Sequence, residues 1–429
     1  MPVISSFRPY RYNPAHINDP GAVIAPPYDV ISAEKRRALI QRDPHNVILL
    51  ILPEGDDAEK YAHANELYRQ WIDSGILERE PDEAIYPYAQ LFDHPVTGDR
   101  IERRGFIAVA RLSPFSAGEI LPHEKTLSGP KADRLKLMLA TDANLEPIFG
   151  VYPDPAGSST ERLNRLMENA DPLLTVTDSD GVEHRLWRAS APGDIDGIAA
   201  DLRGNRVFIV DGHHRYETAL NYQRMMRERN PELPDGAPCD SIMIFLAPSS
   251  DPGLVILPTH RIIHSLPDFD FDALLARLEP NFALRDEAVD TAVTELSRHT
   301  STPGFLLLAG NRAVLATLRP EIAAASLVDP SLPEPLQELD VTVLHDHILQ
   351  NLLGITPEAQ AAQSNLRYVK SMEDALEAAA GEDVQLVVVM NATRLEQVEN
   401  VAGSGSVMPQ KSTYFYPKLA SGLLFNPLR

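Results

Sequence analysis

Apolar segments alternate with amphipathic segments along this chain, and the clearest alternation begins at residue 207. The four apolar residues 207–210 predict a buried strand, and the helical spacing of Tyr216, Ala219 and Met226 predicts a helix after it. The polar residues 211–215 would then lie at the mouth of a strand, where open α/β sheets place their ligands. We therefore expect this strand, turn and helix to form the centre of a binding site.

The rest of the chain repeats this pattern. Buried strands are predicted at 47–52, 147–152, 242–246 and 254–257, helices at 33–40, 60–72 and 158–167, and an inserted β-hairpin between 84 and 112. From Asp268 onward, helices at 271–278 and 291–298 and strands at 305–308, 313–318 and 386–390 read as a separate unit. We expect an α/β protein with a mixed sheet, divided into residues 1–265 and 266–429.

Composition narrows the classes of partner. The 429 residues include 39 Lys and Arg against 61 Asp and Glu, and the resulting net charge of -22 repels nucleic acids and anionic membranes. The single cysteine, Cys239, excludes an internal disulfide framework, and no apolar run approaches the ~20 residues of a membrane span. The first residues show no export signal. We expect a cytoplasmic protein that binds small molecules, has no nucleic-acid or membrane partner and could form homo-oligomers.

The segment Asp211-Gly212-His213-His214-Arg215 has the composition of an anion site. A glycine before a helix lets the backbone approach an anion, and the first N–H groups of the helix favour negative charge. Arg215 and the two histidines add donors, while Asp211 could accept a proton or bind Mg2+. The alternative is structural, with Asp211 as a helix cap, but five such residues in a row favour function. Zinc fits less well, because adjacent histidines point in different directions on a helix.

A second polar cluster consists of His123, Glu124, Lys125 and Thr126, and Arg134 follows on a predicted helix. Glu124 is a candidate general base toward a hydroxyl, and the neighbouring cations could steer a phosphate. The alternative is a solvated, charged loop.

Two further groups are weaker candidates. His260 and Arg261 end a predicted strand but lack a glycine, so a structural role competes with a functional one. Lys411 and Tyr414 belong to a tail that could return to the cleft and line a nucleotide, although alternating Lys and Tyr also protect an edge strand.

The turn at 211–215 resembles the phosphate-binding turn of the ParB/sulfiredoxin superfamily. That group includes partition proteins that bind CTP, sulfiredoxins that use ATP, and free-serine kinases whose turn reads Asp-Gly-His-His-Arg. The whole chain resembles the DUF1015 family, on the segments 25–30, 122–126, 211–216 and 408–418. The resemblance implies a ParB/sulfiredoxin-like, nucleotide-binding core in the first part and an α/β domain in the second.

The resemblance to free-serine kinases also implies a reaction. A phosphoryl group would pass from ATP or ADP, with Mg2+, to the hydroxyl of a small metabolite, with free L-serine as the first choice and O-phosphoserine as its product. Residues 212–215 would hold the phosphates and Asp211 would lie near the transferred group or its Mg2+. Glu124 and Asp29 compete as the base, and Tyr28, Asp29, His260 and Arg261 are the candidates for acceptor contacts.

Other activities of the superfamily fit less well. Sulfiredoxin chemistry needs a cysteine in the turn, and the turn has none. A nucleotide-binding or nucleotide-hydrolysing switch of the partition-protein type is an alternative, although the sequence shows no basic DNA-binding module. A metal-dependent phosphohydrolase is a third possibility, distinguished by transfer of the phosphate to water.

Overall fold

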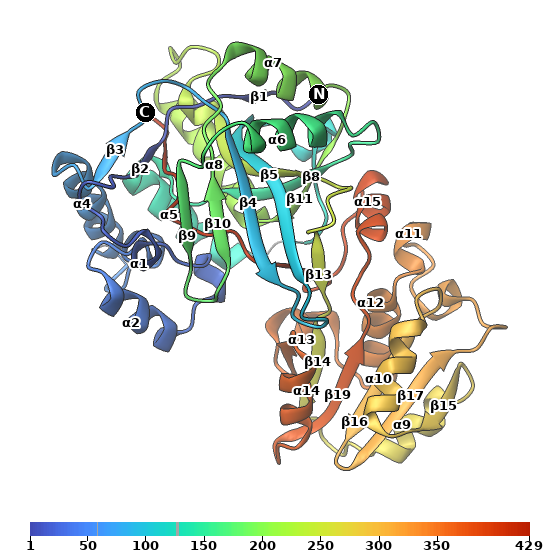
Figure 1. The fold of residues 1–429 in the computed structure, drawn as a ribbon. Helices are drawn as coiled ribbons and strands as arrows, with labels where there is room; N and C mark the ends of the chain where they lie inside the picture. The colour runs from blue at the N-terminus through green and yellow to red at the C-terminus, as the bar shows by residue number, and fades with distance from the viewer. Residues whose placement is uncertain (58, 126–127) are drawn as a thin grey trace. The chain divides into compact units, whose positions relative to one another are not determined.

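The computed structural model describes residues 1–57, 59–125 and 128–429, which fold into two compact units (Figure 1). The first unit comprises Met1–Pro122, Thr126–Val255 and Pro417–Arg429, and the second comprises His123–Lys125 and Ile256–Tyr416. The chain crosses from the first unit to the second within β13 (Val255–Leu257). The sequence predicted this boundary between residues 265 and 266. Both units mix helices and strands, so the predicted α/β class is confirmed.

A mixed sheet of nine strands, counted over the described residues, forms the centre of the first unit. Its order is β6-β11-β8-β12-β5-β4-β10-β9, with β1 beside β5. The strands are β1 (Ile4–Ser5), β4 (Tyr86–Asp93), β5 (Arg100–Arg111), β6 (Ile120–Pro122), β8 (Ile148–Tyr152), β9 (Leu174–Thr177), β10 (Glu183–Leu186), β11 (Val207–Asp211) and β12 (Ser241–Pro248). Because β6 and β11 are parallel neighbours, their carboxyl ends lie at the same edge of the sheet.

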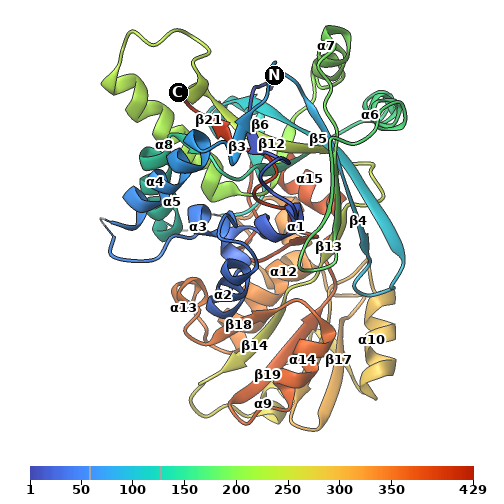
Figure 2. The same cartoon turned by 60° about the vertical axis from the view of Figure 1, so that its left-hand side comes forward.

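The described residues of the first unit form eight α-helices: α1 (Pro20–Val23), α2 (Ala33–Arg42), α3 (Ile48–Ile51), α4 (Lys60–Asp73), α5 (Ser128–Thr141), α6 (Ser158–Glu168), α7 (Pro192–Asp201) and α8 (His213–Arg229). Figure 2 shows α4, α5 and α8 side by side. Ile209 of β11 and Ile244 of β12 share one hydrophobic core with Leu163 of α6 and Tyr216 of α8. Burial of such side chains holds β11 and α8 in place on either side of the turn.

The predicted strand at 47–52 is wrong, because these residues form the short helix α3. Asn46 is fully buried, and its side-chain oxygen accepts a hydrogen bond from the Ile48 N–H (2.9 Å). Its amide group donates to the carbonyls of Ala22 (2.7 Å) and Ile24 (3.1 Å). A short apolar run has no period that separates a buried strand from a buried helical turn, and here Asn46 fixes the helical turn.

The second unit has its own six-stranded sheet, again over the described residues, in which every pairing is antiparallel. Its order is β15-β17-β16-β19-β14-β18, with β14 (His260–His264), β15 (Phe282–Asp286), β16 (Gly304–Ala309), β17 (Arg312–Leu318), β18 (Leu366–Val369) and β19 (Val384–Met390). Its helices are α9 (Phe271–Leu278), α10 (Val289–Arg298), α11 (Glu334–Gln337), α12 (Asp340–Val343) with a π-helix at Leu344–Leu352, α13 (Pro357–Ala362), α14 (Met372–Ala379) and α15 (Leu395–Gly403). The sequence did not predict β15, β18, α11, α13 or α15, and it placed His260 and Arg261 at the end of a strand, whereas they begin β14.

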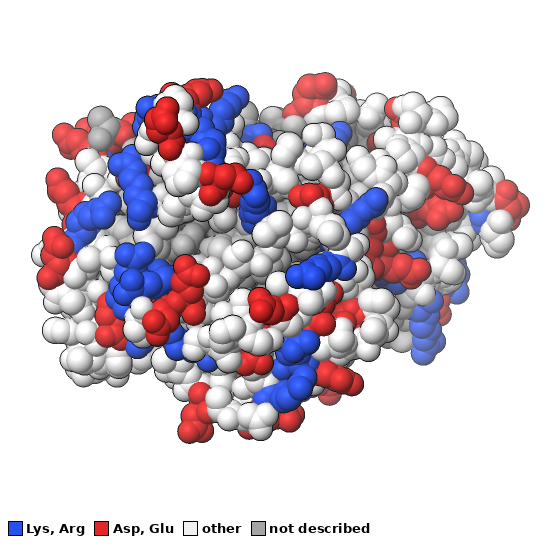
Figure 3. Space-filling model, turned by 90° about the horizontal axis from the view of Figure 1, so that it is seen from above, with Lys and Arg blue, Asp and Glu red and all other residues white. Residues whose placement is uncertain are grey.

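Charged side chains of both signs share the surface. Over the face drawn in Figure 3, Lys and Arg lie among Asp and Glu. Partly exposed ion pairs of the first unit include Lys35 with Asp180 at 2.7 Å, and such pairs contribute only about 0–1 kcal/mol each. No helix in the described part of the chain is both long and apolar enough to span a bilayer.

Candidate functional site

The turn between β11 and α8 has the conformation that its glycine allows. Gly212 has a φ of 86°, in the left-handed region, and a Cβ atom built on it would lie 2.8 Å from the Ile148 side chain. The pairing of β11 with β8 shifts register between Ile209 and Asp211, and Asp211 pairs with Phe149 at the end of the strand. Helix α8 starts at His213, directly after Gly212, so the first N–H groups of the helix lie at this end of the strand.

Replacement of Gly212 by alanine is expected to destabilise the first unit by about 2–4 kcal/mol, because left-handed backbone strain adds to overpacking against Ile148. Gly204→Ala is the matched control, since Gly204 has the same φ of 86° but nothing within 4 Å of its built Cβ atom. The control should lose only about 1–2 kcal/mol. Urea unfolding followed by circular dichroism measures both, and equal losses would show that the close approach to Ile148 is unimportant.

Asp211 is held between two cations. Arg215 Nη2 lies 2.7 Å from Asp211 Oδ2, and Lys418 Nζ donates a short hydrogen bond to Asp211 Oδ1. The three side chains are 10–12% exposed. Burial alone would raise the pKa of Asp211, but Lys418 and Arg215 outweigh it and hold that pKa well below its usual value. The turn thus contains an ionised carboxylate with a lysine and an arginine at its two oxygens.

The C-terminal residues 417–429, which we call the C-terminal strap, bring Lys418 to the turn. The buried Gln90 donates to the Lys418 carbonyl (3.0 Å), and Arg103 donates to the Pro417 carbonyl (2.6 Å). Further along, Phe425 exchanges two backbone hydrogen bonds of 2.8 Å with Tyr10. Strand β21 (Asn426–Pro427) pairs with β7 (Ala143–Asn144). The strap is therefore an integral part of the first unit.

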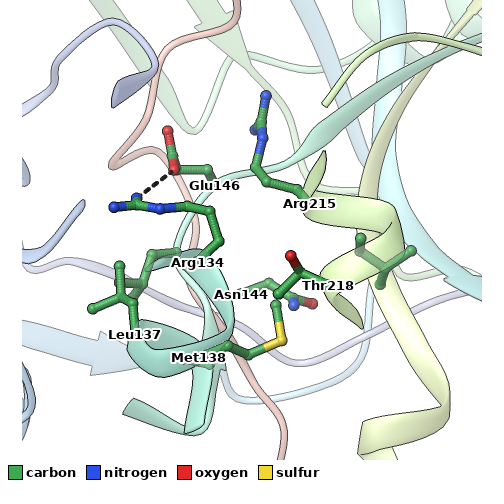
Figure 4. Close-up of a pocket in the computed structure, with 10 residues that line it drawn as sticks. Arg134, Leu137, Met138, Asn144, Glu146, Arg215 and Thr218 are labelled. Carbon is green, nitrogen blue, oxygen red and sulfur yellow. Dashed lines mark ion pairs between the residues drawn. The ribbon is translucent and has the colours of Figure 1, made fainter. Parts of the chain in front are cut away.

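Arg215 connects the turn to a buried carboxylate and a small cavity (Figure 4). Its Nη1 donates to the Pro147 carbonyl, next to Glu146. Burial would lower the pKa of Arg215, but the nearby carboxylates, Glu146 first, raise it above its usual value. The cavity measures about 40 Å³ and is lined by side chains of α5, β7, the segment before β8, α8 and β12, among them Arg134, Asn144, Glu146, Arg215 and Thr218.

Glu146 is, together with Lys418, a candidate functional residue that sequence reasoning missed. It is 7% exposed, and its Oε1 accepts from the Tyr28 N–H (3.2 Å) and the Ser421 hydroxyl (3.1 Å). Burial raises its pKa, although Arg215 and Arg134 act in the opposite direction. The sequence did contain one indication of its role: Glu146 lies between Leu145 and a predicted buried strand, where a carboxylate is unusual.

The other predicted residues of the first unit lie around these groups. His213 is buried, His214 is half-buried, and both start α8. Arg134 lies with its guanidinium 4.0 Å from the centre of the Tyr28 ring. Burial raises the pKa of Tyr28 to about 12, with Arg134 opposing and Asp29 adding to the effect. Asp29 is exposed, in a short 3₁₀-helix at Tyr28–Val30.

The remaining predicted residues belong to the second unit, apart from Thr126, which lies outside the described residues. The Glu124 carboxylate accepts from the N–H groups of Ser412 (3.1 Å) and Thr413 (3.0 Å) and from the Thr413 hydroxyl (3.1 Å). His123 is buried and its Nε2 lies 2.7 Å from the same hydroxyl, whereas Lys125 is exposed. Glu124 therefore fastens residues 412–413, and its role as a base stays a prediction.

His260 and Arg261 are buried in the second unit. Burial, reinforced by Arg261, lowers the pKa of His260 to about 4, and burial lowers that of Arg261 to about 10. Arg261 Nη2 donates to the Lys411 carbonyl (3.1 Å), and Lys370 Nζ lies 3.7 Å from the centre of the Tyr414 ring. These contacts give the predicted residues structural partners, and their roles toward acceptor or nucleotide stay predictions.

The predicted Mg2+ ligand Asp211 does not fit a metal ion in this arrangement, because Lys418 and Arg215 occupy its two oxygens. Nor do the described residues gather three His, Cys, Asp or Glu side chains that could hold one. The turn as folded supplies its positive charge from Lys418 and Arg215 instead.

Comparisons with known proteins place this chain in a sequence family. The family model described as "Protein of unknown function (DUF1015)" matches residues 4–342. No curated protein matches.

Solved structures resemble this chain only at low sequence identity and low TM-score. A conserved hypothetical protein from Pyrococcus furiosus shares 16% identity, with 71% of this chain and 93% of that one covered and a TM-score of 0.35. A free serine kinase in complex with AMP shares 15% identity over 71% of this chain and 89% of that one, with a TM-score of 0.37. SbnI with a C-terminal truncation, from Staphylococcus aureus, shares 10% identity over 75% and 87%, also with a TM-score of 0.37. Likeness at this level carries no information on activity.

Proposed function

This chain belongs to the DUF1015 family, and we propose that it transfers a phosphoryl group from an adenine nucleotide, ATP or ADP, to the hydroxyl of a small metabolite. The first choice of acceptor is free L-serine, with O-phosphoserine as product. One observation carries the proposal. A glycine turn before a helix, next to a buried carboxylate, has a lysine and an arginine at the end of the helix that favours an anion.

The turn supplies two kinds of donor for the phosphates. The first N–H groups of α8 lie at the positive end of the helix dipole, and together they favour an anion at this end. The Arg215 guanidinium and the Lys418 ammonium add two positive charges in a largely buried environment. Phosphoryl transfer depends mainly on positioning and charge stabilisation, which is the chemistry that such donors provide.

Asp211 has a positioning role in this account. Its ionised carboxylate compensates the charges of Arg215 and Lys418 while the turn is empty, and so keeps both cations at the mouth of β11. When the nucleotide binds, its phosphate oxygens take over part of that compensation. Groups fixed before the reaction need no reorganisation in the transition state.

The direct test is incubation of the protein with ATP or ADP, Mg2+ and a panel of small hydroxyl compounds that includes L-serine, followed by mass spectrometry. We expect a phosphorylated acceptor. Release of phosphate to water alone would instead indicate a phosphohydrolase, and binding of CTP with slow hydrolysis would indicate a nucleotide switch. Absence of any phosphorylated acceptor with both donors would refute the proposal.

A further inference from the structure

The cavity beside the turn contains polar groups that the folded chain leaves without partners. The Thr218 hydroxyl is fully buried and has no hydrogen-bond partner. The Asn144 side-chain N–H₂ group, in a residue that is 3% exposed, has none either. Both residues line the cavity, and Figure 4 shows the Thr218 hydroxyl directed into it. Buried polar groups without partners cost about 1–3 kcal/mol each, so two of them at one cavity indicate a ligand.

The two oxygens of the Glu146 carboxylate, which lines the cavity, have different partners. Both of its hydrogen bonds, from the Tyr28 N–H and the Ser421 hydroxyl, go to Oε1. Oε2 has only a distant ion pair with Arg134, whose Nη1 lies 3.9 Å away. The N–H groups of Arg134 are directed to the Asp133 carboxylate and to the Ile51 carbonyl. Oε2 is therefore fixed in position and able to accept a proton from a molecule in the cavity.

The size and charge of the cavity define what it can hold. A volume of about 40 Å³ is about three to four times the ~10–15 Å³ that one water molecule needs, and the walls of Leu137, Met138 and Ile242 suit a short carbon chain. Asn144 and Thr218 offer donors, and the guanidinium groups of Arg134 and Arg215 add positive charge. The donors and the positive charge suit a carboxylate, and Glu146, which lies beside the two guanidinium groups, suits a hydroxyl.

From this arrangement we infer that the cavity receives the acceptor of the proposed reaction, a small molecule with a hydroxyl and a carboxylate, and that Glu146 Oε2 takes its hydroxyl proton. Arg215 links this cavity to the phosphate turn through the Pro147 carbonyl and Asp211. The inference rests on the proposed function. It assigns the base to Glu146 rather than to Glu124 or Asp29.

The hydroxyl proton passes to Glu146 Oε2, and the hydroxyl oxygen forms a bond to the terminal phosphorus of the nucleotide. The bond from that phosphorus to its bridging oxygen breaks, and the electron pair stays on the shortened nucleotide. Glu146 then releases its proton to water. Both products are anions, and Arg215 and Lys418 stabilise the charge that moves to the leaving phosphate.

Two variants test the assignment. Thr218→Val keeps the shape of the side chain and removes its hydroxyl, so the KM for the acceptor should rise about 10-fold while the KM for the nucleotide is unchanged. Glu146→Gln should lower kcat about 100- to 10,000-fold and abolish the fall of kcat on the acidic side of the pH profile, because that fall reports protonation of the base. L-Serine and glycerate carry both groups and should react, whereas ethanolamine lacks the carboxylate and should not.

Glu80→Gln is the matched control for Glu146→Gln, because Glu80 is a buried glutamate of the first unit that pairs with Arg11 and Arg188 away from the cavity. Glu80→Gln should keep the wild-type kcat and the fall of kcat on the acidic side of the pH profile. The assignment is overturned if Thr218→Val merely stabilises the fold without changing the acceptor KM, or if Glu146→Gln keeps full turnover. Loss of turnover with Asp29→Asn alone would give the base to Asp29 and overturn it as well.

A binding measurement separates this inference from the proposed function. If the wild-type protein phosphorylates no acceptor, the proposed function fails, and L-serine is then tested as a ligand by its effect on thermal unfolding. A rise of the unfolding temperature with L-serine in the wild type but not in Thr218→Val would still support the cavity as a site for this class of molecule. No rise in either protein would overturn it.

Discussion

Exchange of Lys418 for methionine is expected to lower the rate of phosphoryl transfer by about 100- to 1000-fold, the usual effect of removing one donor that stabilises transition-state charge. Methionine keeps the apolar stem and removes the ammonium group that lies on Asp211. Asp211 still has Arg215 as a partner, so the first unit should stay folded. Steady-state kinetics with the acceptor found by the panel measure the change, and circular dichroism measures the fold.

The control for this variant is another lysine of the first unit that pairs with an aspartate. Lys35 Nζ lies 2.7 Å from Asp180 on the surface, so Lys35→Met removes a lysine–aspartate ion pair without touching the turn. Its turnover should equal that of the wild type. Full turnover of Lys418→Met would show that Lys418 only anchors the C-terminal strap.

Replacement of Asp211 by asparagine is expected to abolish activity and to lower the free energy of unfolding by about 3–5 kcal/mol near neutral pH. The reason is that two largely buried cations, Arg215 and Lys418, then face an uncharged amide. Asp201→Asn is a milder control, because Asp201 is 11% exposed but pairs through its carboxylate with a single arginine, Arg162, at 2.9 Å. Asp201→Asn should lower the free energy of unfolding by less than Asp211→Asn does, and it should leave turnover intact.

The loss with Asp211→Asn should depend on pH in a defined direction. The folded protein holds the pKa of Asp211 well below its usual value of about 3.9, so the stability from this carboxylate is complete above that unfolded value. It declines as the pH falls toward the folded pKa. The difference in unfolding free energy between wild type and variant should therefore be constant from pH 5 to pH 8 and shrink below about pH 4. A difference that grows in acid would contradict the ion-pair account.

Local pattern was sufficient for the elements next to the turn. The apolar run of β11, the glycine after Asp211 and the helical spacing of α8 depend on residues close in sequence, and the structure shows all three. The prediction of a strand at 47–52 was wrong. The conformation of this segment depends on one buried polar side chain, Asn46, and a single side chain produces no periodic pattern in the sequence. Single buried contacts of this kind override local preference.

The partners of the turn could not be predicted from local pattern. Lys418 reaches Asp211 across 207 residues, and its position depends on the backbone contacts of the C-terminal strap with Gln90 and Arg103. The sequence predicted a tail that returns to the cleft. The residues predicted to line the nucleotide, Lys411 and Tyr414, lie in the second unit. Glu146 was missed because its role depends on Tyr28 and Ser421, which are distant in sequence.

The central claim, that the turn after β11 holds nucleotide phosphates, is tested most directly by a crystal structure of the protein with ADP. We predict that the phosphate oxygens lie against the N–H groups of residues 213–215, with Arg215 and Lys418 within hydrogen-bond distance. Phosphates bound elsewhere, with the contacts of Lys418 and Arg215 to Asp211 unchanged, would contradict it.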